Sequence, residues 1–186
     1  MMKNGILNLA AAIVTTASAI GLTALGSAPA HASSPPSYKL IANSGSTALD
    51  ITANGLSSPV IISNRGTDDN WVFVNSQRWT NLNGTVVQVS EIQHAGTANC
   101  INYSQGLFEM SGCVSGDKNE LFWADPTGST TNGNPNYWFI NVAASETAHQ
   151  YIFVTAQSLT NGSTLVGDGP GFGGLAAWNR QCSANC

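Results

Sequence analysis

Short runs of β-forming residues, separated by turn dipeptides, make up most of this chain. The runs occupy residues 38–42, 48–52, 59–63, 71–74, 85–89, 107–110, 137–142 and 151–155. Asn-Gly dipeptides at 54–55, 83–84, 132–133 and 161–162 lie between the runs, and Asn-Gly readily adopts the positive φ angles of tight hairpin turns. Residues 143–150 allow one helical turn but lack a sustained helical period. The pattern predicts an all-β barrel or sandwich.

The runs also repeat. Residues 47–73 (TALDITANGLSSPVIISNRGTDDNWVF) align with residues 97–124 (TANCINYSQGLFEMSGCVSGDKNELFWA), and residues 148–178 form a weaker third copy. Residues 38–40, 78–79 and 137–139 open the three units. Each unit leads into a tryptophan, namely Trp71, Trp123 and Trp178. Three units of roughly fifty residues predict a pseudo-threefold fold in which these tryptophans are equivalent and largely buried. Chance spacing of tryptophans and turns is the alternative.

The first 32 of the 186 residues have the organisation of a secretory signal peptide. Lys3 precedes the apolar stretch 6–25, and Ala30-His31-Ala32 supplies the small-x-small pattern that signal peptidase cleaves. An uncleaved membrane anchor is the alternative, because the stretch approaches the length of a bilayer-spanning helix. We predict cleavage before Ser33, secretion, and no membrane span in the mature chain.

The cysteines form an even set, which in a secreted protein predicts two disulfides and no free thiol. Three pairings are possible, and we favour Cys100 with Cys113 and Cys182 with Cys186, because each pair closes a short loop and the second secures the chain end. A metal site would need clustered Cys-x-x-Cys or Cys/His spacing, which neither His94 nor His149 provides. No metal or other cofactor is therefore expected.

Residues 100–123 (CINYSQGLFEMSGCVSGDKNELFW) resemble one repeat of the ricin-type β-trefoil lectins. In that family a Cys-hydrophobic-Asp strand precedes a second cysteine and a loop that ends in tryptophan. The resemblance matches Cys100 and Cys113 to the disulfide within the repeat, Asn119 to the loop amide and Trp123 to the core tryptophan. Asn102 stands where the family carries its sugar-binding aspartate. The resemblance implies an all-β, β-trefoil domain over residues 33–186 that binds carbohydrate.

The first unit resembles the same repeat through residues 49–51 and 68–71, without cysteines. A neutral sugar needs a carboxylate to accept from its hydroxyls, an amide to donate, and an aromatic face against its C–H groups. In the first unit Asp50 and Asn70 supply the carboxylate and the amide, and residues 60–64 lack the aromatic platform. Asn102, Phe108 and Asn119 form the candidate pocket of the second unit. The structural alternative is that Asp50, Asn70 and Asn119 cap turns and Phe108 fills the core.

Other chemistries find little support. Neither His94 nor His149 lies in a recognisable nucleophile context, and no spacing couples two carboxylates for glycoside hydrolysis. The glycine-rich run 167–174 lacks the Gly-Lys-Ser/Thr ending of a phosphate-binding loop. We expect a protein that is not an enzyme.

Charge argues against one class of partner. The chain carries 6 basic and 10 acidic residues, a formal net charge of -4, and only 9% of its residues are charged. Nucleic-acid binding needs a basic surface that neutralises phosphates, so nucleic acid is not expected as a partner.

Three functions remain. The first is a secreted carbohydrate-binding module with pockets repeated about the pseudo-threefold axis. The second is a protein-binding trefoil, such as an inhibitor of an extracellular hydrolase, which would use a protruding loop at 126–136 or 167–174. The third is a decayed trefoil with a purely structural role. The paired placement of Asp50 with Asn70 and of Asn102 with Asn119 favours the first.

Overall fold

The computed structural model describes residues 34–42, 49–64, 69–171 and 177–186. These residues belong to one compact unit, Ser33–Cys186. The predicted signal peptide, residues 1–32, lies outside the described residues. Within the described ranges, no helix is long and apolar enough to cross a membrane.

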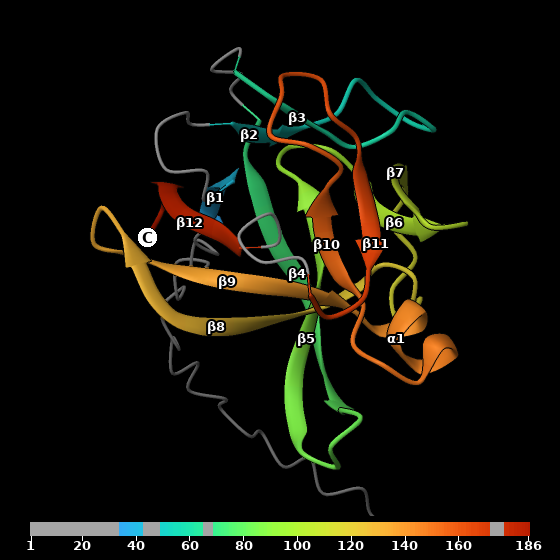
Figure 1. Cartoon of the computed structure of the whole chain (residues 1–186). Helices are drawn as coiled ribbons and strands as arrows, with labels where there is room; N and C mark the ends of the chain where they lie inside the picture. Colours follow the sequence, from blue (N-terminus) through green and yellow to red (C-terminus); the bar gives the residue numbers. More distant parts are fainter. Residues whose placement is uncertain (1–33, 43–48, 65–68, 172–176) are drawn as a thin grey trace, which may run out of the picture. The chain divides into compact units, whose positions relative to one another are not determined.

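Six antiparallel strands close a ring. They are β1 (Ser37–Ala42), β4 (Trp71–Thr80), β5 (Val86–His94), β8 (Leu121–Thr131), β9 (Asn134–Asn141) and β12 (Ala177–Ala184). Each strand pairs with the next in this order, and β12 pairs back with β1, which completes a barrel. The β4–β5 and β8–β9 pairs are long hairpins (Figure 1).

Three further hairpins close one end of the barrel. They are β2 (Asp50–Thr52) with β3 (Ile61–Ser63), β6 (Asn99–Ser104) with β7 (Leu107–Gly112), and β10 (Phe153–Ala156) with β11 (Leu165–Asp168). The backbone N–H of Val60 donates to the carbonyl of Phe108, and that of Leu165 donates to Val60, both at 2.9 Å. These bonds join the first hairpin to the second and to the third. A bridge between Val166 of β11 and Leu107 of β7 joins the second hairpin to the third. A six-stranded barrel capped by a triangle of hairpins is a β-trefoil, so the predicted fold class is confirmed.

The core repeats three times. Leu40, Ile92 and Phe139 occupy corresponding places on β1, β5 and β9, and all are buried. Trp71 and Trp178 lie at the beginnings of β4 and β12. Their indole N–H groups donate to equivalent hairpin carbonyls, those of Ile51 at 3.1 Å and Val154 at 2.8 Å.

The expected equivalence of the three tryptophans is wrong for the second unit. Phe122, not Trp123, lies in the core beside Phe108, with ring centroids 5.8 Å apart. Because side chains alternate across a strand, a shift of one residue turns Trp123 to the opposite face of β8. There it packs against Trp79 and Tyr151 in a smaller cluster outside the barrel.

The predicted opening of the second unit is also wrong. Residues 78–79 lie near the end of β4, the last strand of the first unit, and the second unit begins with β5. In the third unit, α1 (Val142–Ala148) forms where one helical turn was allowed. The Asn141 side chain caps it by accepting from the N–H of Ala144 at 2.9 Å, and His149 ends it in the left-handed conformation.

Both predicted disulfides are present. Cys100 is joined to Cys113 and Cys182 to Cys186, and no cysteine is free. The first bond links β6 to the chain that follows β7, and the second lies at the end of β12. Two disulfides fit an extracellular protein.

Candidate functional site

Asp50 lies on β2, on the face of the first hairpin opposite to Ile51. Its strand neighbours are Ile41 of β1 and Ser63 of β3, and it is 8% exposed. Burial raises the pKa of this carboxyl above its ordinary value of 3.8, the Lys39 ammonium opposes the rise, and the charge of Asp69 adds to it. The first unit therefore holds two carboxylates close enough to repel each other.

Asp69, which lies just before β4, connects β2 to β5. Its carboxylate accepts from the Thr52 hydroxyl of β2 and lies 3.2 Å from Nε2 of His94 at the end of β5. The His94 ring also meets the Trp71 ring edge-on, with centroids 5.3 Å apart. The Asp69 and His94 side chains are 17% and 27% exposed. Sequence reasoning missed Thr52, Asp69 and His94 as a group because they come from three separate segments.

Asn70 joins the same region through its neighbours. Its backbone carbonyl accepts from the N–H of Ala95 at 2.8 Å. The indole N–H of the next residue, Trp71, donates to the carbonyl of Ile51, which follows Asp50 on β2. The side-chain oxygen of Asn70 is buried without a hydrogen-bond partner in the described part of the chain. An unpaired buried acceptor costs about 1–3 kcal/mol, and the fold carries this cost at Asn70.

The strand registers of the first two hairpins identify which of their residues are counterparts. Asp50 faces Ser63 across the first hairpin, as Cys100 faces Ser111 across the second. Asp50 therefore occupies the place of Cys100. The place of Asn102 is taken by Thr52 in the first unit, so Asp50 and Asn102 are not counterparts.

The candidate pocket of the second unit is incomplete. Phe108 is fully buried in the core and cannot offer a ring face to a sugar, which corrects its expected role. The Asn119 side chain donates to Asp117 at 3.1 Å, so its amide is used within its own turn. The carbonyl of Asn119 accepts from the N–H of Tyr103 at 3.0 Å, which brings it near Asn102 on β6. Both asparagines are half-buried.

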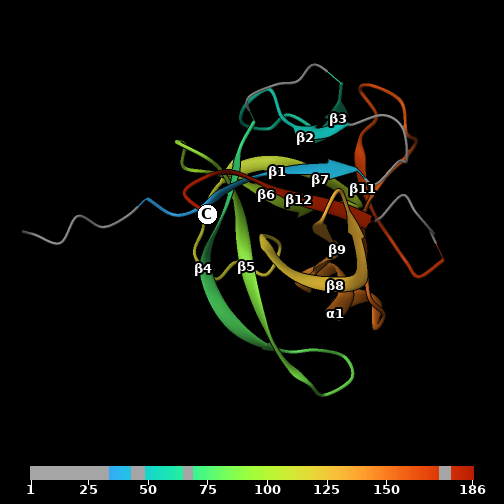
Figure 2. The same cartoon turned by 90° about the vertical axis from the view of Figure 1, so that its left-hand side faces the viewer.

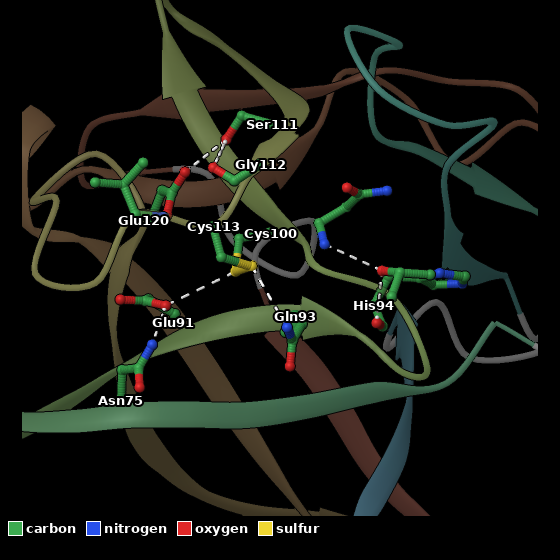
Figure 3. The surroundings of a disulfide bond; sticks show 12 residues. Asn75, Glu91, Gln93, His94, Cys100, Ser111, Gly112, Cys113 and Glu120 are labelled. Atoms are coloured by element: carbon green, nitrogen blue, oxygen red, sulfur yellow. Dashed lines mark hydrogen bonds between the residues drawn. A yellow bond between two sulfur atoms is a disulfide. The ribbon is translucent and has the colours of Figure 1, made fainter.

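Two buried glutamates surround the Cys100–Cys113 disulfide (Figure 3). Glu91 accepts from the Asn75 side chain at 2.7 Å and from the N–H of Gly116 at 3.1 Å. Glu120 accepts from the Ser111 hydroxyl at 2.5 Å and from the N–H of Val114 at 2.7 Å. Glu91 and the two sulfurs lie within 4.8 Å of one another, but sulfurs joined in a disulfide offer no thiolate to a metal. These carboxylates hold the loop in place.

A solved structure similar to this chain is that of a designed threefold-symmetric protein, ThreeFoil. The match covers 78% of this chain and 97% of that one, with a TM-score of 0.54 and 13% sequence identity. At this identity the likeness shows the fold, a β-trefoil. No protein-family model matches the chain, and no curated protein matches its sequence.

Proposed function

We propose that this protein is a secreted, non-enzymatic carbohydrate-binding module whose sugar site lies on the first unit, around Asp50 and Asn70. The grouping of two acidic side chains with a histidine, Asp50 and Asp69 with His94, is the observation that carries the proposal. Asn70, next to Asp69 in the chain, adds a side-chain oxygen without a partner among the described residues. The trefoil fold is shared by carbohydrate-binding and protein-binding proteins, so the fold by itself does not choose between them.

The chemistry of this region suits a hydroxylated ligand. Carboxylates accept from sugar hydroxyls through charge-assisted hydrogen bonds, which are stronger than those that an amide can make. His94 adds a ring that is 27% exposed. Its Nε2 and the buried Thr52 hydroxyl both contact Asp69 and orient that carboxylate. A single shallow site of this kind binds weakly, so useful affinity would come from several contacts with one polysaccharide. The second unit, with Asn102 and Asn119, would contribute a weaker site at most.

The test is binding of the secreted protein to a neutral glycan array and to insoluble polysaccharides. Asp50→Ala and Asn70→Ala should each reduce the bound fraction by about tenfold, as expected for one lost hydrogen bond to a charged or buried group. Asp125→Asn is the matched control, because Asp125 is a half-buried carboxyl on β8 whose pKa is also raised by burial.

The thermal midpoint separates function from structure. If Asp50→Ala lowers the midpoint while binding per folded molecule is unchanged, Asp50 is a structural residue of its hairpin. If the wild type retains no glycan, the carbohydrate proposal is wrong.

A rigid hairpin favours a second candidate function, binding to an extracellular protein. Residues 126–136, singled out as a possible protruding loop, form the end of the β8–β9 hairpin. Asn136 donates to Ser129 at 3.1 Å and to Thr131 at 3.0 Å within it, and Asn179 of β12 donates to the carbonyl of Asn134 at 3.0 Å. A preformed loop loses little entropy on docking, as inhibitor loops require. The other loop, 167–174, is only partly within the described residues.

Inhibition assays against extracellular proteases and glycosidases test this candidate. Asn136→Ala should weaken inhibition by loosening the hairpin, and Asp50→Ala should leave it unchanged. Equal inhibition by the wild type and Asn136→Ala would rule out this hairpin.

A further inference from the structure

The end of the barrel opposite the hairpins is lined by one inward residue from each strand. Every one of these residues lies two positions from a core residue of its strand, and side chains two apart share a face. They are Tyr38 of β1, Phe73 of β4, Ser90 of β5, Ala124 of β8, Tyr137 of β9 and Arg180 of β12. We name this ring of six residues the barrel mouth.

The mouth breaks the pseudo-threefold symmetry of the core. On one side, Tyr38, Phe73 and Tyr137 present large rings. On the other side, Ser90 and Ala124 of the paired strands β5 and β8 are small. The small residues leave a hollow of about 280 Å³, which Gln88 and Arg180 also line.

Arg180 is held between aromatic rings. Its guanidinium carbon lies 4.5 Å from the ring centroid of Tyr38, 4.9 Å from that of Tyr137 and 5.3 Å from that of Phe73. The neighbours of β12 in the barrel are β1 and β9, which explains why Tyr38 and Tyr137 flank it. Such packing fixes the orientation of the guanidinium plane and leaves the N–H donors along its edge available to a ligand.

The charge of Arg180 has no carboxylate partner among the described residues. The ion pairs there join His94 to Asp69 and Lys118 to Glu146. Arginine stays protonated at every physiological pH, so the hollow contains one permanent positive charge beside neutral walls. A planar guanidinium with a free edge binds a carboxylate in a bidentate manner.

We propose that the barrel mouth binds a carboxylated sugar ring, of the hexuronate type, with its carboxylate on Arg180. One cation in a net-acidic protein favours a monoanion over a phosphate dianion. The Gln88 amide lines the hollow and suits a ring hydroxyl, while the rings of Phe73 and Tyr137 suit C–H faces. The Ser90 hydroxyl also lines the hollow and is held by the Ser76 hydroxyl at 2.7 Å, which leaves it one further lone pair for a ligand. The volume admits about one sugar ring, and this site is separate from the one around Asp50.

The test is a titration of the isotopically labelled, secreted protein with sodium glucuronate, followed by two-dimensional NMR, with glucose as the neutral counterpart. Glucuronate should produce saturable shifts at Ser90, Ala124 and the Arg180 side chain, and glucose should not. Arg180→Gln should weaken binding about tenfold or more, the effect of one lost charged hydrogen-bond pair. Short oligogalacturonates then distinguish a free sugar acid from a polysaccharide as the source of the carboxylate.

Two further variants keep the test decisive. Ala124→Leu fills the hollow while Arg180 remains, so it should abolish binding even if Arg180→Gln unfolds the barrel. Lys118→Gln removes one exposed positive charge from another part of the molecule and should leave binding unchanged. Equal affinity for glucose and glucuronate, or no binding of either, would overturn the proposal. Weakening by Arg78→Gln but not by Arg180→Gln would move the site to the exposed Arg78 on β4.

Discussion

Asp50 illustrates how a residue with a suitable side chain for binding also destabilises the fold. Its carboxyl is buried near a second carboxyl, and its pKa is raised mainly by burial. The native state therefore holds this proton more tightly than the unfolded chain does. Ionised Asp50 lowers stability at neutral pH, and this penalty disappears as the pH falls through the raised pKa.

We expect Asp50→Asn to be as stable as the wild type or more stable at pH 7, because the uncharged amide avoids the desolvation of a carboxylate. As the pH falls toward 3.8, the wild type should gain stability relative to the variant. Urea unfolding between pH 4 and pH 7 measures both effects. A wild-type advantage that grows with rising pH would show that the ionised carboxylate is favourably bonded in the fold.

Gly167 on β11 has no space beside it for a side chain. A Cβ at this position would lie 2.6 Å from a ring carbon of Tyr103 and 2.9 Å from a methyl of Ile152. The backbone of β11 packs closely against β6 at this point, so Gly167 has a packing role.

Gly167→Ala should lower the free energy of unfolding by about 1–3 kcal/mol, the usual cost of overpacking a core. Thermal or urea unfolding measures this loss. Gly116→Ala is not a suitable control, since Gly116 has a positive φ, whereas Gly112→Ala meets open space at an ordinary φ.

At the scale of the element, the outer part of the β4–β5 hairpin extends beyond the barrel and is anchored there by contacts of its own. Figure 2 shows it extending away from the β2–β3 hairpin. Trp79 near its end donates to Glu146 of α1 at 3.1 Å, and Glu146 also binds Lys118 at 2.7 Å. The hydrogen bond from Lys118 lowers the pKa of Glu146. The short helix thus connects β4 to the loop before β8.

The register of β8 predicts that Phe122 contributes more to stability than Trp123. Phe122→Ala should destabilise the protein by about 3–5 kcal/mol because it removes a fully buried ring from the barrel core. Trp123→Ala should cost less, since Trp123 is half-buried in the outer cluster. Urea unfolding of both variants measures the difference. The opposite order of losses would restore Trp123 as the core residue of the second unit.

The two disulfides should contribute differently to the free energy of unfolding. The Cys100–Cys113 bond closes a loop of 13 residues in sequence separation, against 4 for Cys182–Cys186. Replacing the first pair by alanines should cost about 3 kcal/mol on the chain-entropy model, and replacing the second pair should cost less. Glu91 and Glu120 also hold the first loop through hydrogen bonds. Part of the stability lost with the first disulfide would therefore come from weakening these hydrogen bonds. Equal losses for the two double variants would contradict the loop-length argument.

For the whole molecule, the prediction concerns processing. We expect the secreted protein to begin at Ser33 and to contain no reactive thiol, since all four cysteines are paired. Intact mass should show the loss of 32 residues and of four hydrogens. Labelling by a thiol reagent without prior reduction, or an intact N-terminus, would contradict it.

What the sequence by itself determined was local or repetitive. Alternating strands and turns, three units, and the two disulfides followed from neighbouring residues, because hairpin turns and short loop closures depend on contacts close in the chain. The tertiary structure decided everything that depends on register. One residue of slip along β8 put Phe122 in the core in place of Trp123. Packing across the barrel brought His94 to Asp69 and Arg180 between Tyr38 and Tyr137. No local pattern encodes these contacts, because they depend on which strands the closed barrel makes neighbours.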